Sequence, residues 1–163
     1  IDPARRFSVK HLLDERLFVI GRPDLEGMPS GEGVRLASLR KLPMVLPSGS
    51  HSLRIVLEQA FARARCVPNV VAEIDGLGTL LDYVAQGHAA TIQPGAATYR
   101  LPRDGGTVAV PVTDRGARRP THVVSLSDDE LSPAGLAARV VVTEVVRDLV
   151  RAGRWAGARL HDS

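Results

Sequence analysis

Strand-like and helix-like segments alternate through residues 44–92, and this alternation limits the possible folds more than any other feature of the chain. Short apolar runs at 44–46, 70–74 and 89–92 have the length of strands. Amphipathic stretches separate them, with apolar residues at helical spacing over 53–64 and 77–85. Strand, helix, strand, helix and strand joined by short links predict a parallel sheet with crossover helices, and therefore an α/β fold.

The flanking sequence predicts further elements. Four large apolar residues at 17–20, closed by Gly21, predict a strand covered on both faces. Ser132 and Pro133 have the pattern of an N-cap and a first-turn proline, and they open a long helix that should stop at Gly153. The remaining expected elements are one or two helical turns at 37–42 and strands at 107–112 and 121–126.

Composition excludes several classes of protein. The content of 44% apolar and 24% charged residues is that of a globular domain. The net charge of +3 is spread along the chain, whereas electrostatic DNA binding needs basic residues clustered on one face. The single cysteine, Cys66, excludes an internal disulfide framework. No apolar run is long enough to span a bilayer, and the given sequence does not open with the pattern of a signal peptide. Abundant arginine and alanine point to a GC-rich bacterial genome.

The best candidate site follows the strand at 44–46. Ser48, Gly49, Ser50, His51 and Ser52 lie where the next helix begins, and a helix N-terminus offers backbone N–H groups to an anion. A purely structural alternative is that Ser50 or Ser52 caps the helix. Gln93, Pro94 and Gly95 follow another strand, and ligands of parallel sheets bind at the carboxyl ends of strands. We therefore expect both segments to face one crevice.

Catalytic motifs do not emerge from the sequence. The five histidines are scattered without the spacing of a zinc site, and surface or loop roles are expected for them. The run from Gly49 to Ser52 lacks a nucleophile elbow, and 75–78 has no P-loop lysine, so it is expected to cap a helix. We predict that the chain is not an enzyme and that it binds no metal ion and no cofactor.

An ordered series of segments resembles the effector-binding domain of LysR-type transcriptional regulators. No single segment is specific for this family, but the order and spacing of the segments along nearly the whole chain are specific for it. The segments that carry the resemblance are 13–20, 36–39, 43–48, 53–54, 71–74, 77–84, 87–94 and 131–134. The tail 149–155 is most similar to the branch of nitrogen-assimilation-control regulators.

The resemblance implies a fold like that of type 2 periplasmic binding proteins, with an effector in the cleft between two lobes. Residues 21–118 would form a complete lobe, and residues 1–20 and 119–163 an incomplete one whose opening strands lie upstream of Ile1. Family effector contacts carried over to this chain fall at Ser48, Gly49, Ser50, His51 and Ser52 and at Gln93, Pro94 and Gly95. The contacts of the other lobe would be missing.

The resemblance also implies a cytoplasmic regulator that senses a small anionic metabolite and controls transcription. Its DNA-binding winged helix-turn-helix would lie outside this chain, and the full-length protein would be a homo-oligomer, a dimer or tetramer. The helix after His51 is a candidate for the dimer contact. Two alternatives remain: a solute-binding protein of the same fold that feeds a transporter, and an enzyme on this fold, for which no catalytic constellation is present.

Overall fold

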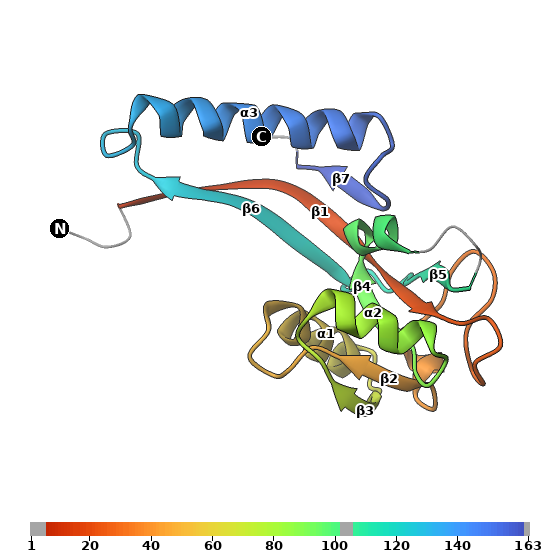
Figure 1. The fold of residues 1–163 in the computed structure, drawn as a ribbon. Coiled ribbons are helices and arrows are strands. Elements are labelled where there is room, and N and C mark those ends of the chain that lie inside the picture. The colour runs from red at the N-terminus through yellow and green to blue at the C-terminus, as the bar shows by residue number, and fades with distance from the viewer. Residues whose placement is uncertain (1–5, 102–105, 162–163) are drawn as a thin grey trace. The chain divides into compact units, whose positions relative to one another are not determined.

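The computed structural model describes residues 6–101 and 106–161 and divides the chain into two compact units. We call residues 16–119 the central unit, and residues 1–15 with 120–163 the terminal unit. Both boundaries fall inside strands, because β1 spans Phe7–Gly21 and β6 spans Arg118–Leu126 (Figure 1). The lobe boundaries expected from the family resemblance, 21 and 118, lie close to these positions.

The central unit contains the alternating segment. Its elements are the 3-10 helix η2 (Leu36–Leu39), β2 (Pro43–Leu46), α1 (Ser52–Arg63), β3 (Asn69–Glu73), α2 (Leu77–Ala85), β4 (Thr91–Pro94), the 3-10 helix η3 (Gly95–Arg100) and β5 (Val108–Pro111). The helices and strands predicted over 44–92 are therefore present, each within a few residues of its expected bounds.

Parallel pairing is confirmed for the three predicted strands. β2 pairs with β3 in parallel register, and Met44 forms a parallel bridge with Ala90 just before β4. The sheet departs from the prediction at β4, which pairs antiparallel with β1. On its other edge the same part of β1 pairs antiparallel with β5. The fold is thus α/β as predicted, with antiparallel strands added to the parallel set.

Apolar packing is concentrated in the central unit. One buried cluster joins α1 to β1, β2 and η2, and includes Leu17, Leu46, Leu57 and Phe61. A second cluster places Leu80 and Val84 of α2 against Ile20 and Val45. Both helices therefore hold the strands from which the candidate site is built.

The terminal unit combines the first half of β1 with β6, α3 (Pro133–Arg151) and β7 (Ala158–Leu160). Ser132 caps α3 by accepting a hydrogen bond from the Gly135 N–H, and Gly153 follows with a φ of 67°, as the sequence predicted. α3 runs along β6 and β1 (Figure 1), yet none of its residues is buried. Four valines of α3 are half exposed or more: Val140, Val141, Val142 and Val145.

One expectation about β1 was wrong. The sequence predicted a strand at 17–20 only, but β1 is a single strand of 15 residues that includes the charged residues 14–16. Glu15 lies inside it fully buried, and its carboxylate accepts hydrogen bonds from Trp155 Nε1 at 2.7 Å and from the Thr121 hydroxyl at 3.4 Å. These partners lie far away in the sequence, and they satisfy a charge that burial would otherwise penalise.

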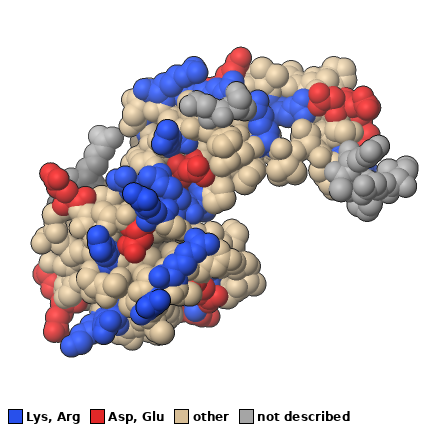
Figure 2. Space-filling model, turned by 180° about the vertical axis from the view of Figure 1, so that it is seen from behind, with Lys and Arg blue, Asp and Glu red and all other residues tan. Residues whose placement is uncertain are grey.

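Charge is mixed on the surface. On the face that Figure 2 shows, Asp and Glu side chains lie among the Lys and Arg side chains, so that face carries both signs of charge. None of the helices in the described ranges combines the length and the apolar character that crossing a bilayer needs.

Leu57→Ala should lower the free energy of unfolding by about 2–5 kcal/mol, because Leu57 is fully buried between α1 and the strands and its truncation leaves a cavity. Ile55→Ala on the same helix is the matched control, since Ile55 is 48% exposed, and should cost less than about 1 kcal/mol. Urea unfolding followed by circular dichroism measures both. Equal losses would contradict the assignment of the buried face of α1.

Candidate functional site

A cavity of about 280 Å³ lies in the central unit, where the carboxyl ends of β2, β3 and β4 come together. His51 follows β2, Asp75 follows β3, and Gln93 and Pro94 end β4. The remaining lining residues are Pro47, Leu53, Leu77, Leu80, Ala96, Ala97, Arg100 and Arg119. One residue of the segment predicted after β2, His51, thus lines the same cavity as Gln93 and Pro94 of β4.

Only part of the predicted set lines this cavity. His51, Gln93 and Pro94 do, whereas Ser48, Gly49, Ser50, Ser52 and Gly95 do not. Asp75, Arg100 and Arg119 were missed as lining residues. Asp75 follows a predicted strand and could have been found by the same rule as His51, but nothing local in the sequence marks the two arginines.

His51, rather than Ser50 or Ser52, is the N-cap of α1. Its Nδ1 accepts a hydrogen bond from the Leu53 N–H at 3.2 Å. An accepting Nδ1 carries no proton, so the neutral ring has its proton on Nε2. The capping bond therefore leaves His51 Nε2 as a hydrogen-bond donor at the mouth of the helix.

The loop after β2 is held by two charged residues. The Asp75 carboxylate accepts a hydrogen bond from the Ser48 N–H at 2.9 Å. Arg54 donates from one nitrogen, Nη1, to the Pro47 carbonyl at 3.0 Å and to Glu73 at 2.7 Å. Hence the Ser48 N–H, expected to be open to a ligand, already has a partner, and Asp75 is not the cap of α2, whose N-cap is Gly76.

Hydrogen bonds with Ser48, first from its backbone N–H and then from its side chain, lower the pKa of Asp75 below its ordinary value of 3.8. Asp75 is therefore ionised at neutral pH. The cavity thus combines one anchored carboxylate with two arginines, the His51 ring and the Gln93 amide, whose Nε2 donates to Thr91 Oγ1 at 3.2 Å.

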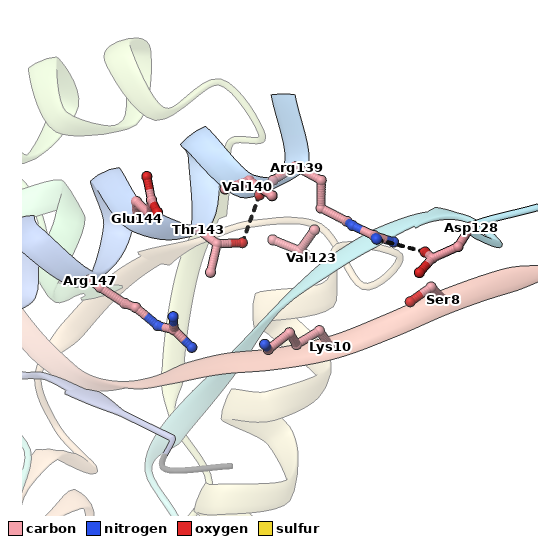
Figure 3. A pocket seen from close by; sticks show the side chains of 9 residues that line it. All are labelled: Ser8, Lys10, Val123, Asp128, Arg139, Val140, Thr143, Glu144 and Arg147. Atoms are coloured by element: carbon pink, nitrogen blue, oxygen red, sulfur yellow. Dashed lines mark hydrogen bonds and ion pairs between the residues drawn. The ribbon is translucent and has the colours of Figure 1, made fainter. Parts of the chain in front are cut away.

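A second hollow, of about 340 Å³, lies in the terminal unit between α3 and the strands β1 and β6. Figure 3 shows Lys10 and Arg147 reaching into it from opposite sides, while Arg139 turns aside to Asp128 at 2.6 Å. Within the described residues, neither Lys10 nor Arg147 has a hydrogen bond of the kind that fixes Asp75 or His51. We therefore take the cavity of the central unit as the candidate site.

The expectation of scattered histidines does not hold in the terminal unit. His11 stacks between His122 and His161, and its Nε2 lies 3.1 Å from an oxygen of Asp14. The strand pairing that brings these residues together is not visible in their sequence spacing.

Residues 2–153 match the LysR substrate binding domain family. The chain belongs to this family. The match confirms the resemblance recognised from the ordered series of segments and covers the central unit and most of the terminal unit.

Two curated regulators are similar in sequence. The chain is 28% identical over 99 residues to the nitrogen assimilation regulatory protein nac of Escherichia coli (strain K12), a match over 61% of this chain and 31% of that protein. It is 29% identical over 149 residues to the HTH-type transcriptional regulator BbuR of Bordetella bronchiseptica, covering 90% of this chain and 45% of BbuR. The chain therefore spans less than half the length of these relatives.

Among solved structures, the effector binding domain of QuiR in complex with shikimate is similar, with a TM-score of 0.72 at 13% identity. The alignment covers 91% of this chain and 69% of that domain. At this identity the likeness establishes the fold alone, and it confirms the predicted fold of the type 2 periplasmic-binding-protein kind.

Asp75→Asn should abolish an acid transition at the loop after β2. The pKa of Asp75 is lowered by folding, so the stabilisation it gives is complete above the ordinary value of 3.8 and is lost as the pH falls through the lower folded pKa. The Ser48 amide resonance, followed by NMR between neutral and acid pH, should move in this range in the native protein and stay flat in Asp75→Asn. Asp82→Asn, an exposed change on α2, should leave the transition in place.

Proposed function

We propose that this chain is the effector-sensing part of a LysR-type transcription regulator and that its ligand is a small anionic metabolite. The observation that carries the proposal is the cavity at the ends of β2, β3 and β4, in a chain that belongs to the LysR substrate binding domain family. We propose binding without catalysis. A cytoplasmic location fits the same role.

The charges around the cavity support an anionic ligand. Arg100 and Arg119 bring positive charge to the cavity. His51, which also lines it, is the N-cap of α1, so the positive end of the helix dipole lies beside the His51 ring. Guanidinium groups suit carboxylates and phosphates because their paired N–H donors match two oxygens. The negative charge of the Asp75 carboxylate would repel a second anionic group of the ligand. A ligand hydroxyl beside Asp75 could instead donate a hydrogen bond to it.

Size narrows the ligand further. Cavities for drug-sized ligands usually exceed about 300 Å³, so a space of about 280 Å³ suits a compact metabolite. A hydroxylated carboxylate meets both conditions: its carboxylate would face the arginines, and a hydroxyl group would face Asp75. The shikimate bound to the QuiR domain is a ligand of this class.

The site we propose for the effector comprises Ser48, Gly49, Ser50, His51 and Ser52 together with Gln93, Pro94 and Gly95, as the family resemblance implies. Within this set, direct contacts are assigned to His51, Gln93 and Pro94, because these line the cavity. The others are proposed to hold the loop in place: the Ser48 N–H is bound to Asp75, and its hydroxyl lies 3.3 Å from that of Ser50.

The rest of the protein is part of the proposal. We infer a winged helix-turn-helix for DNA outside these residues, a homo-oligomeric assembly, and membership of the nitrogen-assimilation-control branch. An effector that prefers one arrangement of the domain would shift the population of DNA-binding states. The partial coverage of the two curated regulators supports additional chain in the full protein.

We also propose that the terminal unit is the incomplete lobe and that further chain covers α3. A helix of 19 residues with no buried side chain and four exposed valines lacks the apolar packing that stabilises most protein helices. The central unit, by contrast, holds both large buried clusters found among the described residues. These clusters support our assignment of the central unit as the complete lobe.

Arg100→Gln and Gln93→Ala should each weaken effector binding by at least about tenfold, since each removes a polar partner worth roughly 1.5–3 kcal/mol when the ligand is charged. A thermal-shift screen of the full-length protein against small carboxylates and phosphates, shikimate included, provides the ligand. Isothermal titration then gives the affinities.

Arg40→Gln is the control for that measurement, because it removes the same charge from an exposed position of the central unit. It should bind the ligand as the native protein does. Ser50→Ala and Ser52→Ala test the predicted helix start and should weaken binding by less than the cavity variants. Unchanged affinity in both cavity variants would contradict the site.

The coding region upstream of Ile1 provides the second test. We expect an in-frame helix-turn-helix followed by a linker helix, and we expect the encoded full-length protein to shift a DNA fragment from its own promoter in a gel. A secretory signal peptide at that position would instead identify a solute-binding protein for a transporter, and the regulatory proposal would fail.

A further inference from the structure

Three histidines, two on strands and one directly after a strand, meet in the terminal unit. His11 lies on β1, His122 lies on β6, which pairs with β1, and His161 directly follows β7. β7 pairs with β1 in the register Leu13 to Leu160, and the His161 N–H donates to the Leu12 carbonyl at 2.9 Å. This register brings His161 beside His11, although 150 positions separate them in the sequence.

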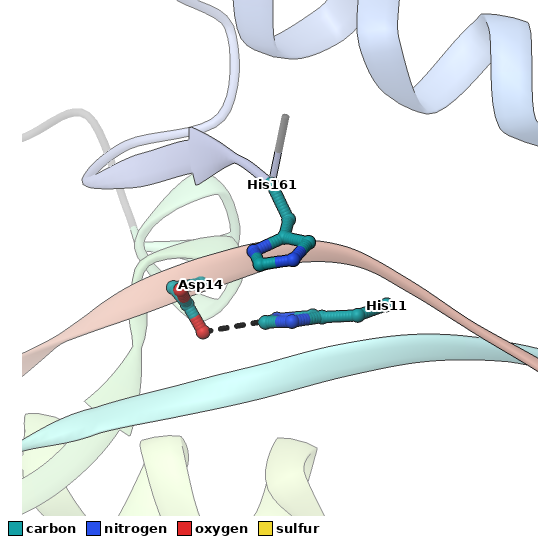
Figure 4. Close-up of side chains that lie close together, drawn as sticks. All are labelled: His11, Asp14 and His161. Carbon is teal, nitrogen blue, oxygen red and sulfur yellow. Dashed lines mark hydrogen bonds and ion pairs between the residues drawn. The ribbon is translucent and has the colours of Figure 1, made fainter. Parts of the chain in front are cut away.

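The three rings form a stack. The centroid of His11 lies 4.2 Å from that of His161 and 4.8 Å from that of His122, with interplanar angles of 23° and 26°. Asp14 lies at the edge of this stack, with Oδ1 3.1 Å from His11 Nε2 (Figure 4). The result is a partly exposed group of imidazole nitrogens with one carboxylate.

We propose that His11, Asp14 and His161 bind a divalent transition-metal ion, for which Zn²⁺ is the reference. Neutral imidazole and carboxylate are the ligands that Zn²⁺ takes at about 2.0–2.2 Å, and two histidines with one carboxylate leave a fourth position for water or for His122. The candidate ligand atoms of the three residues all lie within 4.8 Å of one another. The proposal is independent of the effector site, since all of these residues belong to the terminal unit.

His11 and Asp14 already have a spacing suited to a shared ion. Two ligands of a tetrahedral zinc ion are separated by roughly 3.4 Å, as follows from bond lengths near 2.1 Å. The separation of 3.1 Å between His11 Nε2 and the Asp14 oxygen is near that value, with a proton in place of the metal. The Leu13 carbonyl lies 3.2 Å from the same nitrogen and is a second partner for this proton. Metal binding requires the proton to leave Nε2: a neutral ring carries it on Nδ1 instead, and a doubly protonated ring releases one proton to solvent.

His161 has to move, and its position allows the movement. A metal lies in the plane of the imidazole that binds it, so two stacked rings cannot direct lone pairs at one ion. His161 is exposed at the end of a strand of three residues, whereas His11 and Asp14 are partly buried. Rotation of the His161 side chain therefore closes the site and breaks its stack with His11.

Titration of ZnCl₂ into the metal-free protein, without a polyhistidine tag, tests the proposal. We expect one zinc ion per chain with micromolar or tighter affinity, weaker binding at acid pH because protons compete with the metal for the imidazole nitrogens, and shifts of the His11 and His161 ring protons in NMR spectra. Metal analysis after dialysis should return one equivalent.

Asp14→Asn and His161→Ala should each weaken zinc binding at least tenfold. Asp14→Asn keeps the size of the side chain, and His161→Ala alters an exposed ring, so both variants should keep the circular dichroism spectrum of the native protein. His88→Ala, an exposed histidine of the central unit beside Tyr83, is the matched control and should bind zinc normally. No saturable binding, or native affinity in His161→Ala, would overturn the proposal.

Discussion

Hydrogen bonding on both edges of β1 is the constraint on which the rest of the molecule depends. Leu17 to Ile20 pair with β4 on one edge, and Phe18 to Gly21 pair with β5 on the other. Residues 13–15 of the same strand pair with β7. Pairing with β4 fixes the positions of Gln93 and Pro94 at the cavity, and pairing with β7 fixes the position of His161 beside His11. Both candidate sites therefore take their geometry from one strand.

The buried face of this strand explains why such pairing is stable. Leu17, Val19 and Ile20 are fully buried, so a shift of register by one residue would turn them out of the core. Glu15 is buried as well, but its hydrogen bonds to Trp155 and Thr121 satisfy the carboxylate. A polar residue inside a strand is tolerated here because distant elements supply its partners.

Local patterns in the sequence were sufficient to predict the helices α1 and α2 of the central unit and α3 of the terminal unit. Helical spacing predicted α1 and α2, and the Ser132–Pro133 pair and Gly153 predicted the two ends of α3, because caps and periodicity act within a few residues. The continuity of β1 could not be predicted in the same way. The charged run 14–16 has the local pattern of a break, and only partners more than a hundred positions away reverse it.

The site residues likewise fall into two groups, those that local sequence patterns predict and those that distant pairing brings into place. The rule that ligands bind at the carboxyl ends of parallel strands was enough to place His51 and Gln93 at one cavity. Arg100 and Arg119 reach that cavity through η3 and the start of β6, and no sequence spacing links them to it. The histidine stack was missed for a similar reason: cross-strand register, rather than any interval along the chain, places His11 beside His161.

The hydrogen bond between Trp155 and Glu15 has a practical consequence for experiments on this protein. Trp155 is the single tryptophan and lies in the terminal unit, whereas both tyrosines, Tyr83 and Tyr99, lie in the central unit. The two units therefore carry different natural fluorophores. Tryptophan emission depends on the polarity around the indole ring, which here donates to a buried carboxylate at 2.7 Å. Selective excitation of Trp155 would follow the melting of the terminal unit, and tyrosine emission would follow the central unit, without any added label.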